Sequence, residues 1–138
     1  MKVNPETVAP YELEFSVRDY ECDLQGIVNN AVYQNYYEHA RHQFLLGKKI
    51  DFASLHHEGI DLIVHRVEID YKFSLRSGDR FVVSVATRRE GHLRLVFEQT
   101  IFKLPERRVI SQAKVTGVAL NHGRPIKLEN VPGFEELL

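Results

Sequence analysis

Several residue types and patterns are scarce in this sequence. Its 138 residues contain one cysteine (Cys22), one methionine and no tryptophan. A lone cysteine excludes intrachain disulfide bonds and is typical of a reducing compartment, so we expect a cytoplasmic protein. No apolar run approaches the roughly 20 residues that a membrane-spanning helix needs, and no apolar signal segment opens the chain, so we expect no membrane association.

An excess of charge of either sign is also absent. The chain has 18 Lys and Arg residues against 19 Asp and Glu residues, a formal net charge of −1. Without an overall positive field, we expect no nucleic-acid partner. Hydrophobic residues make up 43% and charged residues 27%, which is typical of a globular protein. We therefore expect residues 1–138 to form a single domain.

The first part of the chain predicts a strand followed by a long helix. Leu13, Phe15 and Val17 alternate with polar residues, as in a half-buried strand. From about residue 30 to residue 46, apolar residues recur at spacings of three and four, as on one face of a helix: Tyr33, Tyr36, Tyr37, Ala40 and Phe44. We expect Asn29 or Asn30 to cap this helix and Gly47 to end it. Residues 51–58 predict a short second helix.

The remaining residues predict strands. Residues 63–74 alternate over an unusually long stretch, with one side made of Ile63, His65, Val67, Ile69, Tyr71 and Phe73. Residues 81–87, 93–102 and 109–120 continue as strands, separated by short turns. Long strands with short turns indicate an antiparallel sheet, and one long helix can lie within its curve. The predicted fold class is α+β.

The loop before the long helix carries the most informative residues. Asp23 lies on it with Gly26, a few residues before the predicted helix start at Asn30. Backbone N–H groups at a helix start can polarise a carbonyl oxygen, and a nearby carboxylate can attack the carbon or activate water. We therefore predict Asp23, Asn30 and Gly26 as catalytic elements for an activated acyl group. Alternatively, Asp23 stabilises a turn, and Gly26 supplies a backbone conformation that side chains hinder.

These residues belong to a longer motif, Tyr20-x-x-Asp23-x-x-Gly26-Ile27-Val28-x-x-x-x-Tyr33-x-x-Tyr36-Tyr37-Glu38-x-x-Arg41, supported by Arg76-Ser77-Gly78-Asp79. The motif resembles hotdog-fold acyl-CoA thioesterases of the 4-hydroxybenzoyl-CoA thioesterase-like branch. The resemblance implies a long antiparallel sheet wrapped around one central helix. It implies Asp23 as the catalytic carboxylate and the Asn30 N–H as the group that polarises the thioester carbonyl.

The resemblance also implies partners. Coenzyme A would be part of the substrate, and no separate cofactor is expected. Hotdog proteins are homodimers or tetramers with the acyl tunnel between subunits, so residues 60–66 of a partner subunit are expected to complete the site.

Two further functions stay open. Many relatives have Tyr-His where this chain has Asn29-Asn30, and Val28-Asn29-Asn30 instead resembles acyl-carrier-protein thioesterases. An acyl-carrier-protein thioesterase is therefore one alternative, and a non-catalytic acyl-CoA-binding or sensing module is another. Direct attack by Asp23 and activation of a water by Asp23 also stay open.

Other residues are candidates for substrate binding. Arg88, Arg89 and Arg94 surround the predicted turn at residues 90–91 and suit the phosphates of coenzyme A, although such clusters are usually a solvated edge. Asn29 could orient water or substrate instead of capping the helix. Tyr33 and His65 could line the substrate channel, although both residue types are common in protein interiors.

Other candidate catalytic or metal-binding residues have less support in the sequence. Glu38 is a second carboxylate, which we expect to pair with Arg41 or His42 at spacings of three and four. Cys22 has no nearby histidine to activate it as a nucleophile. His39 and His42 are predicted to share a helical face with Glu38, but no further ligand cluster is evident, so we expect no metal site.

Overall fold

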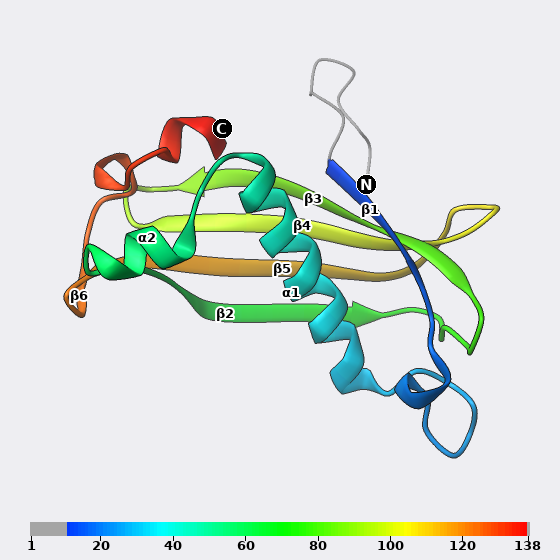
Figure 1. The fold of residues 1–138 in the computed structure, drawn as a ribbon. Helices are drawn as coiled ribbons and strands as arrows, with labels where there is room; N and C mark the ends of the chain where they lie inside the picture. The colour runs from blue at the N-terminus through cyan, green and yellow to red at the C-terminus, as the bar shows by residue number, and fades with distance from the viewer. Residues whose placement is uncertain (1–10, 138) are drawn as a thin grey trace.

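A computed structural model of the chain describes residues 11–137, in which a curled antiparallel sheet carries the long helix α1 across one face (Figure 1). The elements are, in chain order, β1 (Tyr11–Ser16), the 3-10 turn η1 (Asp19–Glu21), α1 (Asn30–Gly47), α2 (Phe52–His57), β2 (Ile60–Tyr71), β3 (Arg80–Glu90), β4 (Arg94–Lys103), β5 (Arg108–Asn121), β6 (Arg124–Pro125), and the 3-10 turns η2 (Leu128–Asn130) and η3 (Phe134–Leu137). The predicted α+β order of strand, long helix and long strands is confirmed.

The sheet has the order β1-β3-β4-β5-β2, and short β6 pairs with the end of β5. All five pairings are antiparallel, as predicted. Sequential strands β3, β4 and β5 are neighbours, whereas β1 and β2 lie at opposite edges because α1 separates them in the chain. The loop before α1 extends beyond one end of β2 (Figure 1).

The predicted apolar face of α1 is the face that packs on the sheet. Its aromatic residues and Ala40 are buried, and Tyr37 is 1% exposed. They contact a sheet interior that includes the buried residues Phe81, Val83, Leu95, Ile101 and Val115. Burying large aromatic side chains gives α1 most of its stabilisation, since most helical stability in proteins comes from packing one face of the helix.

The cap of α1 is Asn29, whose side-chain Oδ1 accepts a hydrogen bond of 2.9 Å from the Ala31 N–H. The helix ends at Gly47, as predicted. The left-handed residue that follows the helix is Lys49, with φ of 62°, and not a glycine. The N–H of Ile50 donates to Leu45 O at 3.1 Å, which closes the last turn and brings two buried apolar side chains together.

Strand β2 departs from the predicted alternation. Its register with β5 shifts between Val64 and Arg66, so His65 is an extra residue in a β-bulge. Val67 lies opposite Val115, whereas Ile63 lies opposite Val118, which faces the other side of the sheet. Ile63 therefore does not share a face with Val67, and the bulge is the reason.

The segment after β5 was not predicted as structure. Turns η2 and η3 return to the sheet and add Leu128, Phe134 and Leu137 to the core. None of the helices within residues 11–137 combines the length and apolar character that crossing a membrane requires.

Substituting Gly47→Ala tests the helix end. Gly47 has an ordinary helical φ, and no atom lies within 4 Å of an added Cβ. We therefore expect the free energy of unfolding to rise by about 0.5–1 kcal/mol, measured by urea denaturation. Lys49→Gly should also stabilise the chain, because Lys49 holds a left-handed conformation that glycine adopts freely. A loss of stability in Gly47→Ala would instead show that the helix end requires glycine at this position.

Candidate active site

The loop that carries Asp23 is a tight, closed turn. Cys22 and Val28 form an antiparallel bridge across its base. Inside it, Asp23 N–H donates to Ile27 O at 2.9 Å and Gly26 N–H donates to Asp23 O at 3.0 Å. Gly26 has φ of +79° with nothing within 4 Å of an added Cβ, so this position needs glycine for its backbone conformation and not for space.

The Asp23 side chain stabilises this turn. Its Oδ1 accepts hydrogen bonds from the N–H groups of Gln25 at 2.9 Å and Ile27 at 3.4 Å. The turn-stabilising alternative is therefore observed. Asp23 is exposed in the single chain, and within residues 11–137 its Oδ2 accepts no hydrogen bond. One carboxylate oxygen is thus fixed, and the other is open to solvent or to a ligand.

Backbone hydrogen bonds hold the turn against the start of α1. Asn29 N–H donates to Glu21 O at 3.1 Å, and Val28 N–H donates to Leu75 O at 2.9 Å. The Asn29 side chain accepts a hydrogen bond from the Ala31 N–H, and its carbonyl accepts one from the Val32 N–H, so Asn29 acts as the cap. No described residue accepts a hydrogen bond from the Asn30 N–H. An open donor therefore lies at the positive end of the α1 dipole, beside the Asp23 turn.

Tyr33 fixes the depth of the helix start. Its hydroxyl accepts a hydrogen bond of 2.9 Å from the Leu75 N–H, and both residues are buried. Burial raises the pKa of Tyr33, so the hydroxyl stays neutral at physiological pH. Tyr33 was a candidate for substrate binding, but the structure places it in the core, 2% exposed, where it positions the loop.

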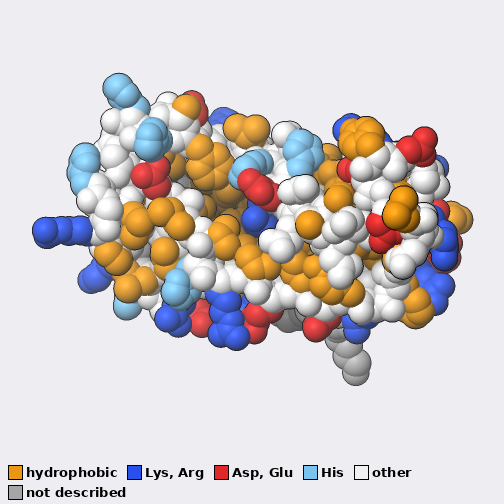
Figure 2. All heavy atoms as spheres, turned by 90° about the horizontal axis from the view of Figure 1, so that it is seen from below, with side chains coloured by type: hydrophobic (Ala, Val, Ile, Leu, Met, Phe, Trp, Pro, Cys, Tyr) orange, Lys and Arg blue, Asp and Glu red, His pale blue; other side chains and the backbone are white. Residues whose placement is uncertain are grey.

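A cavity of about 350 Å³ lies between α1 and β2. Its sheet side is mostly apolar and its helix side is mostly polar, and it is lined by Gln34, Tyr37, Glu38, Arg41, His42, Leu45, Phe52, Leu62, Ile63, Val64, Val67, Ile69, Phe97, Val115 and Gly117. Figure 2, which views the molecule from below, shows a hollow with this mixture of side chains. Hydrophobic side chains surround the hollow, and basic, acidic and histidine side chains lie inside it and at its rim. Asp23 is not among the residues that line it.

Comparison with known proteins decides the family. The sequence model of the thioesterase-like superfamily matches residues 17–136. The chain belongs to this superfamily. The predicted hotdog-fold thioesterase family is thus confirmed.

Individual proteins also resemble this chain. An acyl-acyl carrier protein thioesterase of Arabidopsis thaliana, a chloroplast protein, is 43% identical over 119 residues, which are 86% of this chain and 63% of that protein. The chain therefore spans less than two-thirds of that relative. A hypothetical protein from Aquifex aeolicus has a crystal structure that superposes with a TM-score of 0.84 at 25% identity, covering 94% of this chain and 100% of that one.

A 1,4-dihydroxy-2-naphthoyl-CoA thioesterase from Synechocystis also superposes with a TM-score of 0.84, at 15% identity, covering 91% of this chain and 92% of that one. At this identity the likeness shows the fold alone, which is the hotdog fold.

Within this thioesterase-like chain, Glu38 lies in the cavity. Its Oε1 is 3.8 Å from His42 Nε2, so the expected pairing with His42 is observed. From the sequence, Glu38 was expected only to pair along the helix and was not assigned to a cavity. The signal was present: Asn30, Gln34 and Glu38 are four residues apart and form one polar row along α1.

The two histidines of α1 do not share a face. His42 lines the cavity beside β2, whereas His39 lines a groove beside β1 and packs edge-on against Phe15. Within residues 11–137, no group of three or more His, Cys, Asp and Glu side chains is arranged to hold a metal ion. His65 lies at the bulge of β2 with an exposed side chain and does not line the cavity. Cys22 is a free cysteine and is partly exposed.

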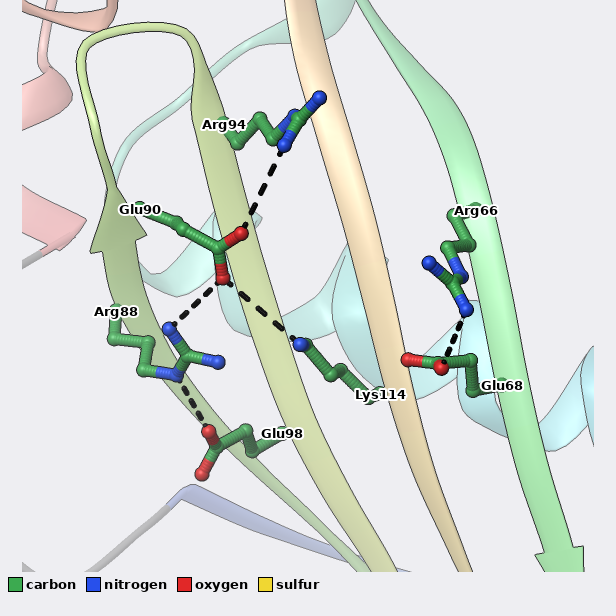
Figure 3. A network of polar contacts seen from close by, with 7 residues as sticks. All are labelled: Arg66, Glu68, Arg88, Glu90, Arg94, Glu98 and Lys114. Atoms are coloured by element: carbon green, nitrogen blue, oxygen red, sulfur yellow. Dashed lines mark hydrogen bonds and ion pairs between the residues drawn. The ribbon is translucent and has the colours of Figure 1, made fainter.

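The predicted basic cluster is neutralised by carboxylates. Figure 3 shows Arg88 between Glu90 and Glu98, with Nη1–Oε2 and Nε–Oε1 distances of 3.2 and 2.6 Å. Arg94 lies 3.9 Å from Glu90. Arg89 turns elsewhere, to Glu129. The arginines also lie at the far end of β3 from the Asp23 turn, which packs near the start of that strand. They do not form a free cationic patch beside the turn.

Tyr33→Phe tests the anchor of the helix start. Removing the hydroxyl leaves the buried Leu75 N–H without an acceptor, so we expect the free energy of unfolding to fall by about 1–3 kcal/mol in urea denaturation. Tyr71→Phe is the matched control, because the Tyr71 hydroxyl donates to Asn30 O at 3.3 Å from an exposed position. It should cost less than about 1 kcal/mol. Equal losses would remove Tyr33 from this role.

Proposed function

We propose that this chain hydrolyses acyl-CoA thioesters to a carboxylic acid and free coenzyme A. The supporting observation is the closed Asp23 turn, which backbone hydrogen bonds hold against a helix start whose Asn30 N–H has no acceptor among the described residues. Membership of the thioesterase-like superfamily supports the reaction class.

The chemistry follows from these two groups. The Asn30 N–H donates to the thioester carbonyl oxygen, where negative charge develops in the transition state, and the helix dipole adds to its effect. The Asp23 carboxylate acts as the base that activates water or as the nucleophile. Two turn N–H groups hold its Oδ1, which fixes the direction of Oδ2 without blocking it. Positioned base catalysis is worth about 10²–10⁴-fold, and one oxyanion donor about 10²–10³-fold.

A specific observation favours a second candidate, an acyl-carrier-protein thioesterase. The Arabidopsis relative with that name is 43% identical to this chain. The arginines expected to bind the phosphates of coenzyme A are also occupied by Glu90, Glu98 and Glu129. Both carriers present the acyl group on the same phosphopantetheine thiol, so the turn and the helix start serve either substrate. The cytoplasmic location stays a prediction.

We further propose that the chain forms a homodimer through β2. This strand lies at the edge of the sheet and exposes apolar side chains, among them Ile63, Val64, Val67 and Tyr71. A long apolar edge strand is usually covered by pairing in native proteins. Antiparallel pairing of two β2 strands about a two-fold axis would cover it, wall the cavity beside α1, and bring partner residues 60–66 close to the site.

Asp23→Asn tests the carboxylate. Asparagine keeps an oxygen that can accept the two turn hydrogen bonds but loses the charge, so the loop should keep its shape. We expect kcat for release of free thiol from acyl-CoA to fall by about 10²–10⁴-fold, measured with a thiol reagent. Asp19→Asn changes an exposed carboxylate in the preceding turn η1 and should keep most of the activity.

Three results would change the proposal. Wild-type rates in Asp23→Asn would remove Asp23 from the reaction, and a loss in Glu38→Gln instead would place the acid on α1. Hydrolysis of acyl-carrier-protein substrates with none of acyl-CoA would select the second candidate. Binding of both substrates without thiol release would identify a non-catalytic binding module.

Val67→Lys tests the dimer. A charge at this position, which is 40% exposed on β2, would be buried between paired strands, so we expect the mass in solution to fall from a multiple of 16.0 kDa to that of one chain. Light scattering after size-exclusion chromatography measures this. Leu93→Lys changes a residue of similar exposure, 44%, in the turn between β3 and β4, and should leave the mass unchanged. A monomeric wild-type chain would contradict the proposal.

A further inference from the structure

The cavity between α1 and β2 contains a cation that the proposed reaction does not use. Arg41 projects from α1 into this cavity, and its guanidinium Nη1 donates to Gln99 Oε1 at 3.1 Å. Gln99 is itself buried, 2% exposed, and its Nε2 donates to Tyr37 O at 3.0 Å. The ring of Phe97 lies 5.9 Å from Arg41 Cζ. The guanidinium is thus held in a fixed direction by a neutral amide of the sheet, which is itself fixed to the backbone of α1.

No carboxylate among the described residues forms an ion pair with this cation within 4.0 Å. The cavity carboxylate Glu38 pairs with His42 and acts on Arg41 only through the field of its charge. Burial lowers the pKa of Arg41. An arginine nevertheless stays charged in a protein, so the charge persists at a partly buried position. A guanidinium has five N–H donors, and Gln99 accepts from one of them. Four donors of this partly buried charge therefore remain for another acceptor.

The surroundings of Arg41 indicate which kind of ligand would carry the hydrogen-bond acceptor. The sheet side of the cavity presents Val67, Ile69 and Val115, which suit an aliphatic or aromatic chain. Arg41 follows Asn30 by eleven positions, about 16 Å along the helix axis, and its side chain leans back toward the helix start. An acyl group whose carbonyl meets the Asn30 N–H and whose chain follows the polar row of α1 therefore reaches Arg41 with its far end.

We propose that Arg41 selects acyl groups that carry an oxygen acceptor, above all a carboxylate, at the end distant from the thioester. The proposal rests on the thioesterase function proposed above and names the substrate class of that site. The planar guanidinium matches a carboxylate in geometry and charge, and the apolar walls accept the chain between the two ends. A plain alkyl end would leave the cation in the cavity without a negatively charged partner, which disfavours such substrates.

The experiment compares octanoyl-CoA with suberoyl-CoA, which has the same length and a carboxylate at its far end. In Arg41→Met we expect kcat/KM for suberoyl-CoA relative to octanoyl-CoA to fall by about 10–100-fold, mostly through KM, because one charge-assisted contact is lost. Arg41→Lys keeps the charge without the fork and should lose less. Lys48→Met removes an exposed cation from the end of the same helix and should leave the ratio unchanged.

A binding measurement separates this inference from the reaction. Calorimetry with suberate and octanoate needs no turnover, and we expect suberate to bind more tightly to the wild-type chain but not to Arg41→Met. If neither thioester is hydrolysed while suberate still binds through Arg41, the hydrolase proposal fails and the recognition by Arg41 stands. If both are hydrolysed and the substitution leaves their ratio unchanged, the role of Arg41 is overturned. Equal binding of the two acids to the wild-type chain also overturns it. Equal binding is the result expected if a carboxylate of a partner subunit pairs with Arg41.

Discussion

The buried hydrogen bond between the Tyr33 hydroxyl and the Leu75 N–H is the constraint on which the site depends. Leu75 also accepts the Val28 N–H, so one short segment holds both the start of α1 and the end of the Asp23 turn. One helical turn later, the Tyr37 hydroxyl donates to Ser111 Oγ, which donates to Asp70 O. Two hydroxyls four residues apart therefore set how deep the helix lies and which way it is rotated.

That rotation determines which side chains meet β2. With the tyrosines directed into the sheet, Gln34, Glu38 and Arg41 are carried to the side that borders the cavity. The helix thus contributes a buried apolar face and a polar wall from adjacent residues. The polar wall faces the strand that the single chain leaves at the sheet edge, so the site and the proposed subunit contact share one surface.

Features that depend on residues close together in the sequence could be predicted, whereas features that depend on contacts between strands could not. The aromatic arc of α1, its asparagine cap, the Gly26 turn and the strand order along the chain follow from spacing and local chemistry. Lys49, just after the helix end, holds a left-handed conformation that glycine favours, because the contact of Ile50 with Leu45 outweighs its local preference. The pairing of Arg88 with Glu98 joins residues brought opposite each other by adjacent strands, which no local pattern encodes.

The bulge at His65 has a consequence for how the length of β2 can vary. Val64 lies opposite Gly117 and Arg66 lies opposite Thr116, which are consecutive on β5, so removing His65 alone would leave a regular ladder. Residues 60–64 would keep their present faces, and Val64 would stay on the cavity wall. A single deletion in the regular part of β2 would instead turn the side chains on one side of it over, so the bulge is where this strand can change its length by one residue while the hydrophobic floor survives.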